Sequence, residues 1–477
     1  MGYKSGIDKK QLSLLPECLD DYVPEDHICR IISEFTRQLD VVALGYKYAE
    51  SKTTGCPPYD PRMMLNLYIY GYMHRVRSSR RLRDEATRNI EVMWLMDGLK
   101  PDDKTICNFR KDNTKALRET FRTFVRMCRN LGLYGEETVA LDGTKFRANS
   151  SLANHYNKTV VKNELGRIDK KISEYMEALE KGDLEEAVET EPSVEQLKAA
   201  LERLKERKEH YEELNRRVKE EGEVSTVDAD ARLMHSSGDG RKFDVGYNAQ
   251  TVVDSKYYMI VDFEVRAQPN DAGNLHTMME RAKDILEVDH LTCLADKGYY
   301  SSQDIAACEQ SGVTCLVAKT HYTGSRKAKG FNHEDFLYDR EKDVYICPCK
   351  NELRRRYHKT LVSGRKYQVY SNAAACARCE KKPACTEYHY RDVSRLVWQD
   401  VMDIVDKRTR ENKELYQKRR EIVEHPYGTI KAVWGYKQFL CRTKPKVIAE
   451  TALAYLAYNM RRMFNIFTEA KVKPVFT

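Results

Sequence analysis

Three charged residues near the C-terminal end of the chain are spaced so that they could share one face of a helix. Arg420, Glu424 and Lys431 form the pattern R-x3-E-x6-K, and positions four and seven apart lie on the same side of a helix. A carboxylate between two cations suits a site where the carboxylate binds a metal ion and the cations bind nucleic-acid phosphates. The pattern favours Glu424 over its rival Glu421, which lies near the same face.

Two further carboxylates follow short apolar runs that are typical of buried strands. Residues 138–141 lead to Asp142, and residues 290–295 lead to Asp296, each with a glycine shortly after it. We expect each strand to end at its Asp, with the glycine allowing the chain to turn. The ends of strands are where α/β folds place their chemistry. Two Asp residues and a helical Glu could hold two Mg²⁺ (or Mn²⁺) ions for an in-line phosphoryl displacement.

These motifs make the chain similar to bacterial insertion-sequence transposases of the DDE type, over nearly its whole length. The resemblance is to the branch whose last acidic residue lies in a Y-x2-R-x3-E-x6-K signature. It implies a ribonuclease-H-like core in which Asp142, Asp296 and Glu424 are the catalytic, metal-binding residues.

Four cations are the predicted DNA contacts. Arg420 and Lys431 match the cations of the signature, and the other two, Lys145 and Lys297, lie beside the two Asp residues. The tyrosine of the signature fits less well, because Tyr416 lies one residue too far from Arg420. Arg419 has the right distance from Tyr416 but lies five residues before Glu424.

The implied function is that of a transposase, which binds the terminal inverted repeats of an insertion sequence and catalyses metal-dependent cleavage and transfer of DNA strands. One ion would activate a water molecule or orient a 3′-hydroxyl, and the other would stabilise the leaving 3′-oxygen. The expected partner is double-stranded DNA, both terminal repeats and target, and family analogy implies a homodimer on it. The alternatives are a transposase-derived DNA-binding protein that no longer cuts, and a non-transposing nuclease of the same fold.

Composition fits a protein that acts on DNA in the cytoplasm, associated with the nucleoid. The 477 residues carry a net charge of +8, which suits a polyanionic partner. The N-terminus lacks an apolar signal, and no run of about twenty apolar residues exists. We therefore expect no membrane partner, and interpret residues 447–467 as a buried amphipathic helix.

The predicted fold class is an α/β core, with a mixed sheet flanked by helices, that carries three additional regions. The N-terminal region is all-α and either contacts DNA or braces the core. An inserted helical hairpin with coiled-coil spacing, 14 Lys and Arg against 19 Asp and Glu, is either a protein-binding arm or a spacer. The third region is a Cys-rich insertion. The expected order is 1–135 (helical N-terminal), 136–157 (first part of the core), 158–223 (hairpin), 224–330 (core continued), 331–400 (Cys-rich insertion) and 401–477 (C-terminal helices of the core with the catalytic Glu).

Within this order, the sequence predicts several local features of the core. Residues 246–254 and 257–265 form a β-hairpin, and 313–318 a later strand. Asp271 is expected to cap the helix that follows it. Asp228 is expected at a cap or turn, with a supporting role at the metal site as the alternative.

Five cysteines between 347 and 385 supply thiolates at spacings that suit a tetrahedral structural Zn²⁺ ion. The candidate ligands are Cys347, Cys376, Cys379 and Cys385. Cys349 could replace Cys347, because four ligands suffice. The alternative is a set of reduced, unliganded thiols in a small β-rich insert.

Overall fold

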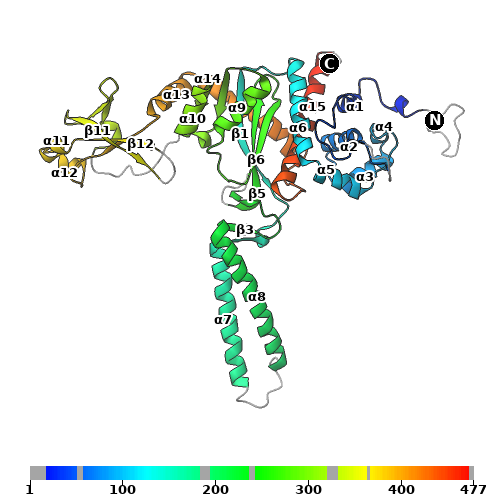
Figure 1. Cartoon of the computed structure of the whole chain (residues 1–477), viewed down its shortest axis with the longest axis horizontal. Helices are drawn as coiled ribbons and strands as arrows, with labels where there is room; N and C mark the ends of the chain where they lie inside the picture. The colour runs from blue at the N-terminus through cyan, green and yellow to red at the C-terminus, as the bar shows by residue number, and fades with distance from the viewer. Residues whose placement is uncertain are drawn as a thin grey trace, which may run out of the picture.

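The computed structural model describes residues 18–50, 57–182, 194–235, 242–319, 331–361 and 366–471. Its centre is a six-stranded sheet in the order β4-β5-β1-β7-β8, with β6 paired to β5 (Figure 1). β1 is antiparallel to β5 and parallel to β7, and β7 is parallel to β8. The predicted mixed sheet is thereby confirmed. Its strands are β1 (Thr138–Arg147), β4 (Arg232–His235), β5 (Phe243–Asp254), β6 (Ile260–Arg266), β7 (Leu291–Ala295) and β8 (Val313–Val317).

The strands form where apolar and β-branched residues run together, because both faces of this sheet are covered. Every residue of β5 from Val245 to Asp254 is buried, and β7 and β8 are buried apart from one residue each. The predicted hairpin is present as β5 and β6, which pair in antiparallel register around the turn at Ser255 and Lys256.

Helices from the second half of the chain surround the sheet: α9 (Leu275–Leu286), α10 (Ser302–Gln310), α13 (Gln399–Glu411), α14 (Lys413–Tyr427) and α15 (Lys444–Glu469). The predicted helix over 447–467 is confirmed as α15, which is buried from Ala449 to Met460. Its fully buried Asn459 accepts a hydrogen bond from the backbone N–H of Ile260 and donates one to the carbonyl of the same residue. A buried polar side chain that is paired in this way fixes the helix against β6.

Asp228 stabilises the start of α15, as expected of a residue at a cap or turn. Its carboxylate accepts hydrogen bonds from the N–H of Thr443 and from the hydroxyl of Tyr247. Asp230 accepts from the N–H of Lys444. Both carboxylates thus satisfy backbone donors at the N-terminus of α15, where the helix dipole favours negative charge.

The N-terminal region forms only helices, turns and irregular segments where it is described. Its α-helices are α1 (Ile28–Arg37), α2 (Pro61–Met73), α3 (Ser79–Arg88), α4 (Ile90–Leu95), α5 (Asp103–Asp112) and α6 (Thr114–Asn130), with a short 3₁₀ helix η1 (Leu19–Tyr22). Asp60 caps α2 and Pro61 is its first residue. The sequence of residues 81–97 predicts one continuous helix, and the structure contradicts this prediction. Asn89 is extended and its side chain accepts from the N–H of Glu91, so α3 ends and α4 begins there.

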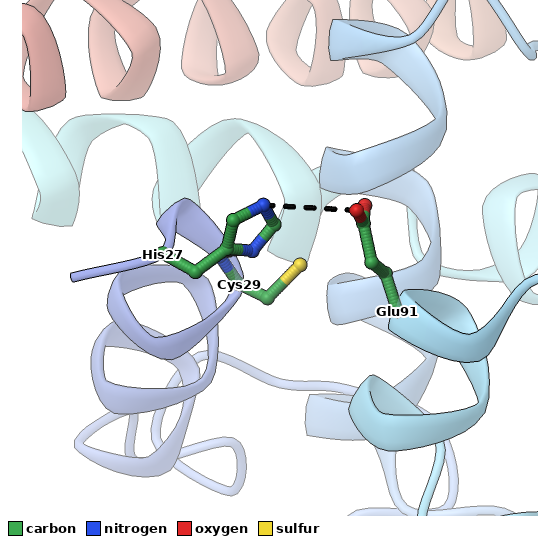
Figure 2. Close-up of side chains that lie close together, drawn as sticks. All are labelled: His27, Cys29 and Glu91. Carbon is green, nitrogen blue, oxygen red and sulfur yellow. Dashed lines mark hydrogen bonds and ion pairs between the residues drawn. The ribbon is translucent and has the colours of Figure 1, made fainter. Parts of the chain in front are cut away.

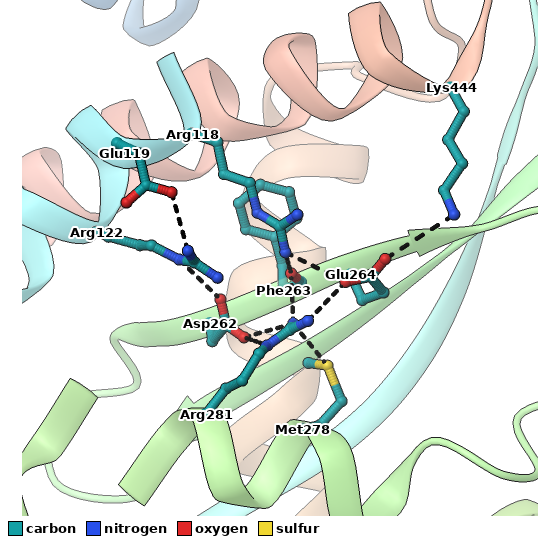
Figure 3. Close-up of polar contacts among 9 residues, drawn as sticks. All are labelled: Arg118, Glu119, Arg122, Asp262, Phe263, Glu264, Met278, Arg281 and Lys444. Carbon is teal, nitrogen blue, oxygen red and sulfur yellow. Dashed lines mark hydrogen bonds and ion pairs between the residues drawn. The ribbon is translucent and has the colours of Figure 1, made fainter. Parts of the chain in front are cut away.

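A network of charged residues joins this helical region to the sheet (Figure 3). Arg281 of α9 donates hydrogen bonds to Asp262 (2.6 Å) and Glu264 (2.7 Å) of β6. Arg118 of α6 donates to Glu264 at 3.2 Å, and Arg122 of α6 lies 3.9 Å from Asp262. Asp262 is completely buried, and a buried charge is stable only when it is paired in this way.

Two insertions extend from the sheet in different directions (Figure 1). In the first, α7 (Lys158–Gly182) and α8 (Val194–Glu221) lie side by side on a two-stranded base of β2 (His155–Asn157) and β3 (Glu223–Ser225), beside the short η2 (Leu152–Asn154). The turn of the predicted hairpin, residues 183–193, lies outside the described residues.

The second insertion is a separate antiparallel sheet with a small core of its own, which includes Phe336, Tyr345 and Tyr370. Its elements are η4 (His333–Asp335), β9 (Leu337–Asp339), β10 (Val344–Ile346), β11 (Glu352–Thr360), β12 (Lys366–Ser371), α11 (Ala373–Ala377), α12 (Lys382–Cys385) and β13 (Val393–Leu396). Among all described helices, none combines the length and apolar character that a membrane span requires.

Candidate active site

Asp142 and Asp296 are brought together by the register of two parallel strands. Leu141 of β1 pairs with Ala295, the last residue of β7. The next residue of each strand is the Asp, so the two carboxylates lie side by side where β7 ends. Asp296 is the expected strand-end residue and precedes a 3₁₀ helix, η3 (Lys297–Tyr299).

The expected end of the first strand at Asp142 is wrong. β1 continues to Arg147, and Asp142 pairs with Thr251 in its middle. Gly143 does not have a positive φ angle, so it is not needed for a turn. Its missing side chain provides space: a Cβ atom there would lie 2.4 Å from Asp271 Oδ1 and from Gln250 Nε2.

The third acidic element, α14, is fastened to these strands by two tyrosines and an arginine. The hydroxyl of Tyr427 donates to the carbonyl of Asp142 at 2.9 Å, and that of Tyr416 to the carbonyl of Ala295 at 3.3 Å. Arg419 lies between them, with guanidinium nitrogens 3.6 Å from a carboxylate oxygen of Asp142 and 3.6 Å from one of Asp296. Arg419 thus bridges both Asp residues.

Burial raises the pKa of Asp142 to about 6, because a partly desolvated carboxylate is less stable when charged. The Arg419 cation and the N–H of Gly143 oppose that rise, and the nearby carboxylates of Asp296 and Asp271 add to it. An additional cation at this position would therefore favour the ionised form of Asp142.

Glu424 lies on the exposed side of α14, and its carboxylate has no hydrogen bond or ion pair with any described residue. The structure thus brings Asp142 and Asp296 together but does not join Glu424 to them. Its rival Glu421 is also exposed and accepts a 2.6 Å hydrogen bond from the hydroxyl of Tyr258. Of the neighbouring arginines, Arg420 is exposed and Arg419 is buried.

The helix that carries Glu424 changes its geometry just beyond it. Pro426 lies inside α14, and Gly428–Val433 form a π-helical segment, η5. Pi-helical turns are frequent at functional sites. This one carries Lys431, whose ammonium donates to Thr144 Oγ1 (2.9 Å) and to the carbonyl of Lys145 (2.8 Å) on β1. Burial lowers the pKa of Lys431 to about 8, and Lys437 adds to the effect.

The two lysines beside the Asp residues differ in position. Lys145 lies on β1, where its backbone pairs with Asn248 of β5. Lys297 opens the 3₁₀ helix that follows Asp296 and is exposed. Each lysine is therefore close in the chain to one of the two Asp residues. Lys145 follows Asp142 on β1, and Lys297 follows Asp296 in η3.

Asp271 also lies at this site, which the sequence did not predict. The expected cap is wrong, because α9 begins at Leu275 and the capping position is Asn274. Asp271 instead accepts hydrogen bonds from the side chains of Asn248 and Gln250 on β5, next to β1. The side-chain oxygen of Asn248, Oδ1, is buried without a hydrogen-bond partner among the described residues.

These features fit a divalent cation. Mg²⁺ and Mn²⁺ take oxygen ligands, mostly carboxylates, and three Asp carboxylates lie at this site, two of them in contact with Arg419. Asn248 Oδ1, a buried acceptor that no described residue pairs with, lies 2.9 Å from the position that a Cβ of Gly143 would take. A buried acceptor normally accepts a hydrogen bond, for example from a water molecule.

The cysteines of the second insertion converge around one small cavity lined by Cys347, Cys349, Cys376, Cys379 and Cys385. The Sγ atoms of Cys349 and Cys379 lie 3.6 Å apart, which is close to the separation of two thiolates on one tetrahedral zinc ion. Cys347 Sγ accepts a 3.3 Å hydrogen bond from the N–H of Asn351. Cys349, the possible replacement for Cys347, therefore lines the same cavity as Cys347.

A second group of possible metal ligands, His27, Cys29 and Glu91, lies among the N-terminal helices (Figure 2). His27 Nε2 is 3.7 Å from Glu91 Oε1. The other ligand atoms are already used: His27 Nδ1 accepts from the N–H of Cys29, and Glu91 Oε2 accepts from the Tyr70 hydroxyl. Burial raises the pKa of the Cys29 thiol to about 12, which keeps it protonated. The packing of α1 against α4 therefore explains why these three side chains lie close together.

Two family models match the chain. Residues 17–112 match a transposase domain (DUF772), and residues 219–460, slightly more than half of the chain, match a transposase DDE domain. The second match contains Asp296, Asp271 and Glu424. Asp142 precedes it, but β1 joins the same sheet through β5 and β7.

No curated protein matches the chain. Among solved structures, the cryo-EM structure of a piggyBac transposase synaptic complex with hairpin DNA aligns with 93% of this chain and 76% of that one. The sequence identity is 9% and the TM-score 0.35, a similarity that carries no argument about this site.

Proposed function

Because the chain belongs to the DDE transposase family, we propose that it binds the terminal inverted repeats of an insertion sequence and uses Asp142, Asp296 and Glu424 to cleave and transfer DNA strands. The observation that carries this proposal is the register of β1 and β7, which sets Asp142 beside Asp296. We further propose that the core is ribonuclease-H-like, which the parallel strands β1, β7 and β8 beside the antiparallel β5 support. The branch with the Y-R-E-K signature remains part of the same proposal.

Enzymes of this family depend on divalent metal ions. Mg²⁺ or Mn²⁺, as a pair of ions, would be held by Asp142, Asp296 and Glu424. When bound, such ions supply Lewis-acid stabilisation of the attacking and leaving oxygens. The protein contributes the carboxylates, held in place by the sheet and by the hydroxyl of Tyr427 on the carbonyl of Asp142.

Arg419 has a charge-balancing role in this proposal. Its guanidinium, buried between Asp142 and Asp296, offsets the repulsion of two like charges. Lys431, Arg420, Lys145 and Lys297 would bind phosphates of the DNA backbone, which position the duplex without reading its sequence.

The remaining regions have proposed roles as well. We assign residues 1–135 to a DNA-binding domain and residues 136–157, 224–330 and 401–477 to the catalytic core, with insertions at 158–223 and 331–400. A homodimer on DNA would cleave the two ends of the insertion sequence. Because the protein would bind chromosomal DNA, we propose that it is found at the nucleoid.

The Cys-rich insertion would hold one structural Zn²⁺ ion. Cys376, Cys379 and Cys385 would be three ligands, and Cys347 or Cys349 the fourth. Convergence of the five side chains on one cavity supports this proposal, and so does the small core of the insertion, because a bound metal adds stability that such a core does not supply.

The function can be tested with DNA that carries the inverted repeats flanking the coding sequence. The purified protein should cleave the repeat ends and join them to target DNA only when Mg²⁺ or Mn²⁺ is present. D296N should bind the repeats with unchanged affinity and produce no cleavage. Binding without cleavage by the unaltered chain in both metals would support the alternative, a DNA-binding protein that has lost its activity. Cleavage without joining, on unrelated DNA as well, would support a nuclease.

A further inference from the structure

Asp271 lies close to two glycines, Gly143 of β1 and Gly298 of η3. A Cβ atom at Gly143, next to Asp142, would lie 2.4 Å from Asp271 Oδ1. A Cβ atom at Gly298, two residues after Asp296, would lie 3.1 Å from Asp271 Oδ2. Glycine at both positions therefore lets a third carboxylate approach the backbone of the two elements that carry Asp142 and Asp296.

Two amides of β5 hold this carboxylate by one oxygen only. Asn248 Nδ2 and Gln250 Nε2 both donate to Asp271 Oδ1, at 2.8 and 2.6 Å. Gln250 is itself oriented by the hydroxyl of Tyr299, which donates to its Oε1. Both amides use Oδ1, whereas Oδ2 is the oxygen nearest to Gly298, two residues after Asp296.

Asn248 provides an independent observation that a ligand belongs here. Its side chain is 1% exposed, and its Oδ1 has no hydrogen-bond partner among the described residues. This oxygen is 2.9 Å from the position that a Cβ of Gly143 would take, so it faces the same space as Asp271. A buried acceptor that lacks a donor costs stability unless a water molecule or a cation satisfies it.

We propose that Asp271 is a fourth active-site carboxylate, which binds a divalent cation together with Asp142, and that Asn248 accepts a hydrogen bond from a water molecule on that cation. This inference rests on the proposed function, because it concerns the same site. It assigns a role to residues that neither the R-x3-E-x6-K pattern nor the strand-end Asp residues include. The alternative is that Asp271 only fastens the 267–274 loop to β5.

The test is Mn²⁺ binding to the full chain without DNA, measured by calorimetry and by electron paramagnetic resonance. In D271N the side-chain oxygen can still accept from both amides, but the negative charge is lost. We expect Mn²⁺ affinity to fall at least roughly tenfold, with a thermal unfolding midpoint close to that of the unaltered chain. D284N, an exposed Asp on α9, is the matched control and should bind Mn²⁺ normally.

A second variant keeps the inference testable if D271N folds poorly. G143A adds a methyl group that would displace Asp271 and Gln250, and should weaken Mn²⁺ binding while every carboxylate is retained. Normal Mn²⁺ affinity in D271N and G143A, with binding lost in D142N, would overturn the role of Asp271 and leave the proposed function intact. Normal affinity in D142N and D296N as well would instead overturn the proposed active site.

Discussion

The guanidinium of Arg419 lies 3.6 Å from the carboxylate of Asp142, although the two residues are far apart in the sequence. The contact fastens α14 to β1 and, through a second 3.6 Å contact, to Asp296 beyond the end of β7. Its neighbour Arg420, which fits the R-x3-E-x6-K pattern, points to solvent. The chain thus has two adjacent arginines with different expected roles, and they can be tested separately.

Replacing Arg419 should destabilise the protein when divalent ions are absent. In R419A the carboxylates of Asp142 and Asp296 face each other without a cation, and we expect the free energy of unfolding to fall by about 1 to 3 kcal/mol. Mn²⁺ should restore part of this loss by replacing the missing charge. Thermal unfolding with and without Mn²⁺ measures both effects.

R420A is the control for this prediction. Because Arg420 is exposed, its removal should change the free energy of unfolding by less than about 0.5 kcal/mol and should weaken DNA binding instead. Equal unfolding midpoints for R419A and the unaltered chain in metal-free buffer would show that the Arg419 contacts do not stabilise the protein.

The choice between Glu424 and Glu421 can be decided by their amide variants. E424Q should reduce strand cleavage more than about a hundredfold, as expected for the loss of a metal ligand, with DNA affinity retained. E421Q should cleave normally, because Glu421 accepts its hydrogen bond from Tyr258 on the surface. Both variants are measured with the same repeat DNA and metal; normal cleavage by E424Q with loss in E421Q would transfer the role to Glu421.

The sequence predicted the parts of this site that depend on local pattern. Apolar runs ending at Asp142 and Asp296 predicted β1 and β7, and helical spacing predicted the helix around Glu424. Contacts made through tertiary structure were not predictable in this way. The sequence favours a helix cap for Asp271, because Asp is common at that position. Only the pairing of β5 with β1 shows that Asn248 and Gln250 place it at the site.

Arg419 was partly predictable, because the sequence contains a pattern that includes it. Its distance from Tyr416 matched the signature, whereas Arg420 matched the distance to Glu424. The helix face could not be decided without knowing that Tyr416 and Tyr427 pack toward the strands. Gly143 is a similar case. The sequence predicts a turn at this glycine, whereas in the structure the absence of a side chain leaves space for Asp271.

The zinc proposal predicts one Zn²⁺ ion per chain that depends on the cysteine cluster. C376S, C379S, C385S and the double variant C347S/C349S should each lose the metal, whereas one of the two single variants at 347 and 349 should keep it. Co²⁺ substitution should give the absorption bands of tetrahedral thiolate coordination. C18S, which removes an exposed cysteine outside the cluster, should bind Zn²⁺ normally. A metal-free protein with a disulfide between Cys349 and Cys379 would contradict the proposal.

Lys431 should make DNA binding depend on pH in the alkaline range. Its pKa of about 8 means that its charge is present below that pH and is lost as the pH rises through it. The logarithm of DNA affinity should therefore depend less steeply on the logarithm of salt concentration at a pH well above 8 than at neutral pH. The difference in slope should equal the contribution of about one phosphate contact. In K431R the charge persists, and the slope should remain constant.

Protein stability provides the second readout for Lys431, with the sign set by proton binding. Because the folded pKa lies below that of an unfolded lysine, the unfolded chain binds more protons between the two values, and the free energy of unfolding should rise with pH across that interval. K431R should lack this rise. The unaltered chain could show this rise in stability while its DNA affinity changes with pH in the same way as that of K431R. In that case Lys431 only fastens η5 to Thr144 and Lys145 of β1, and the phosphate contact must come from another cation.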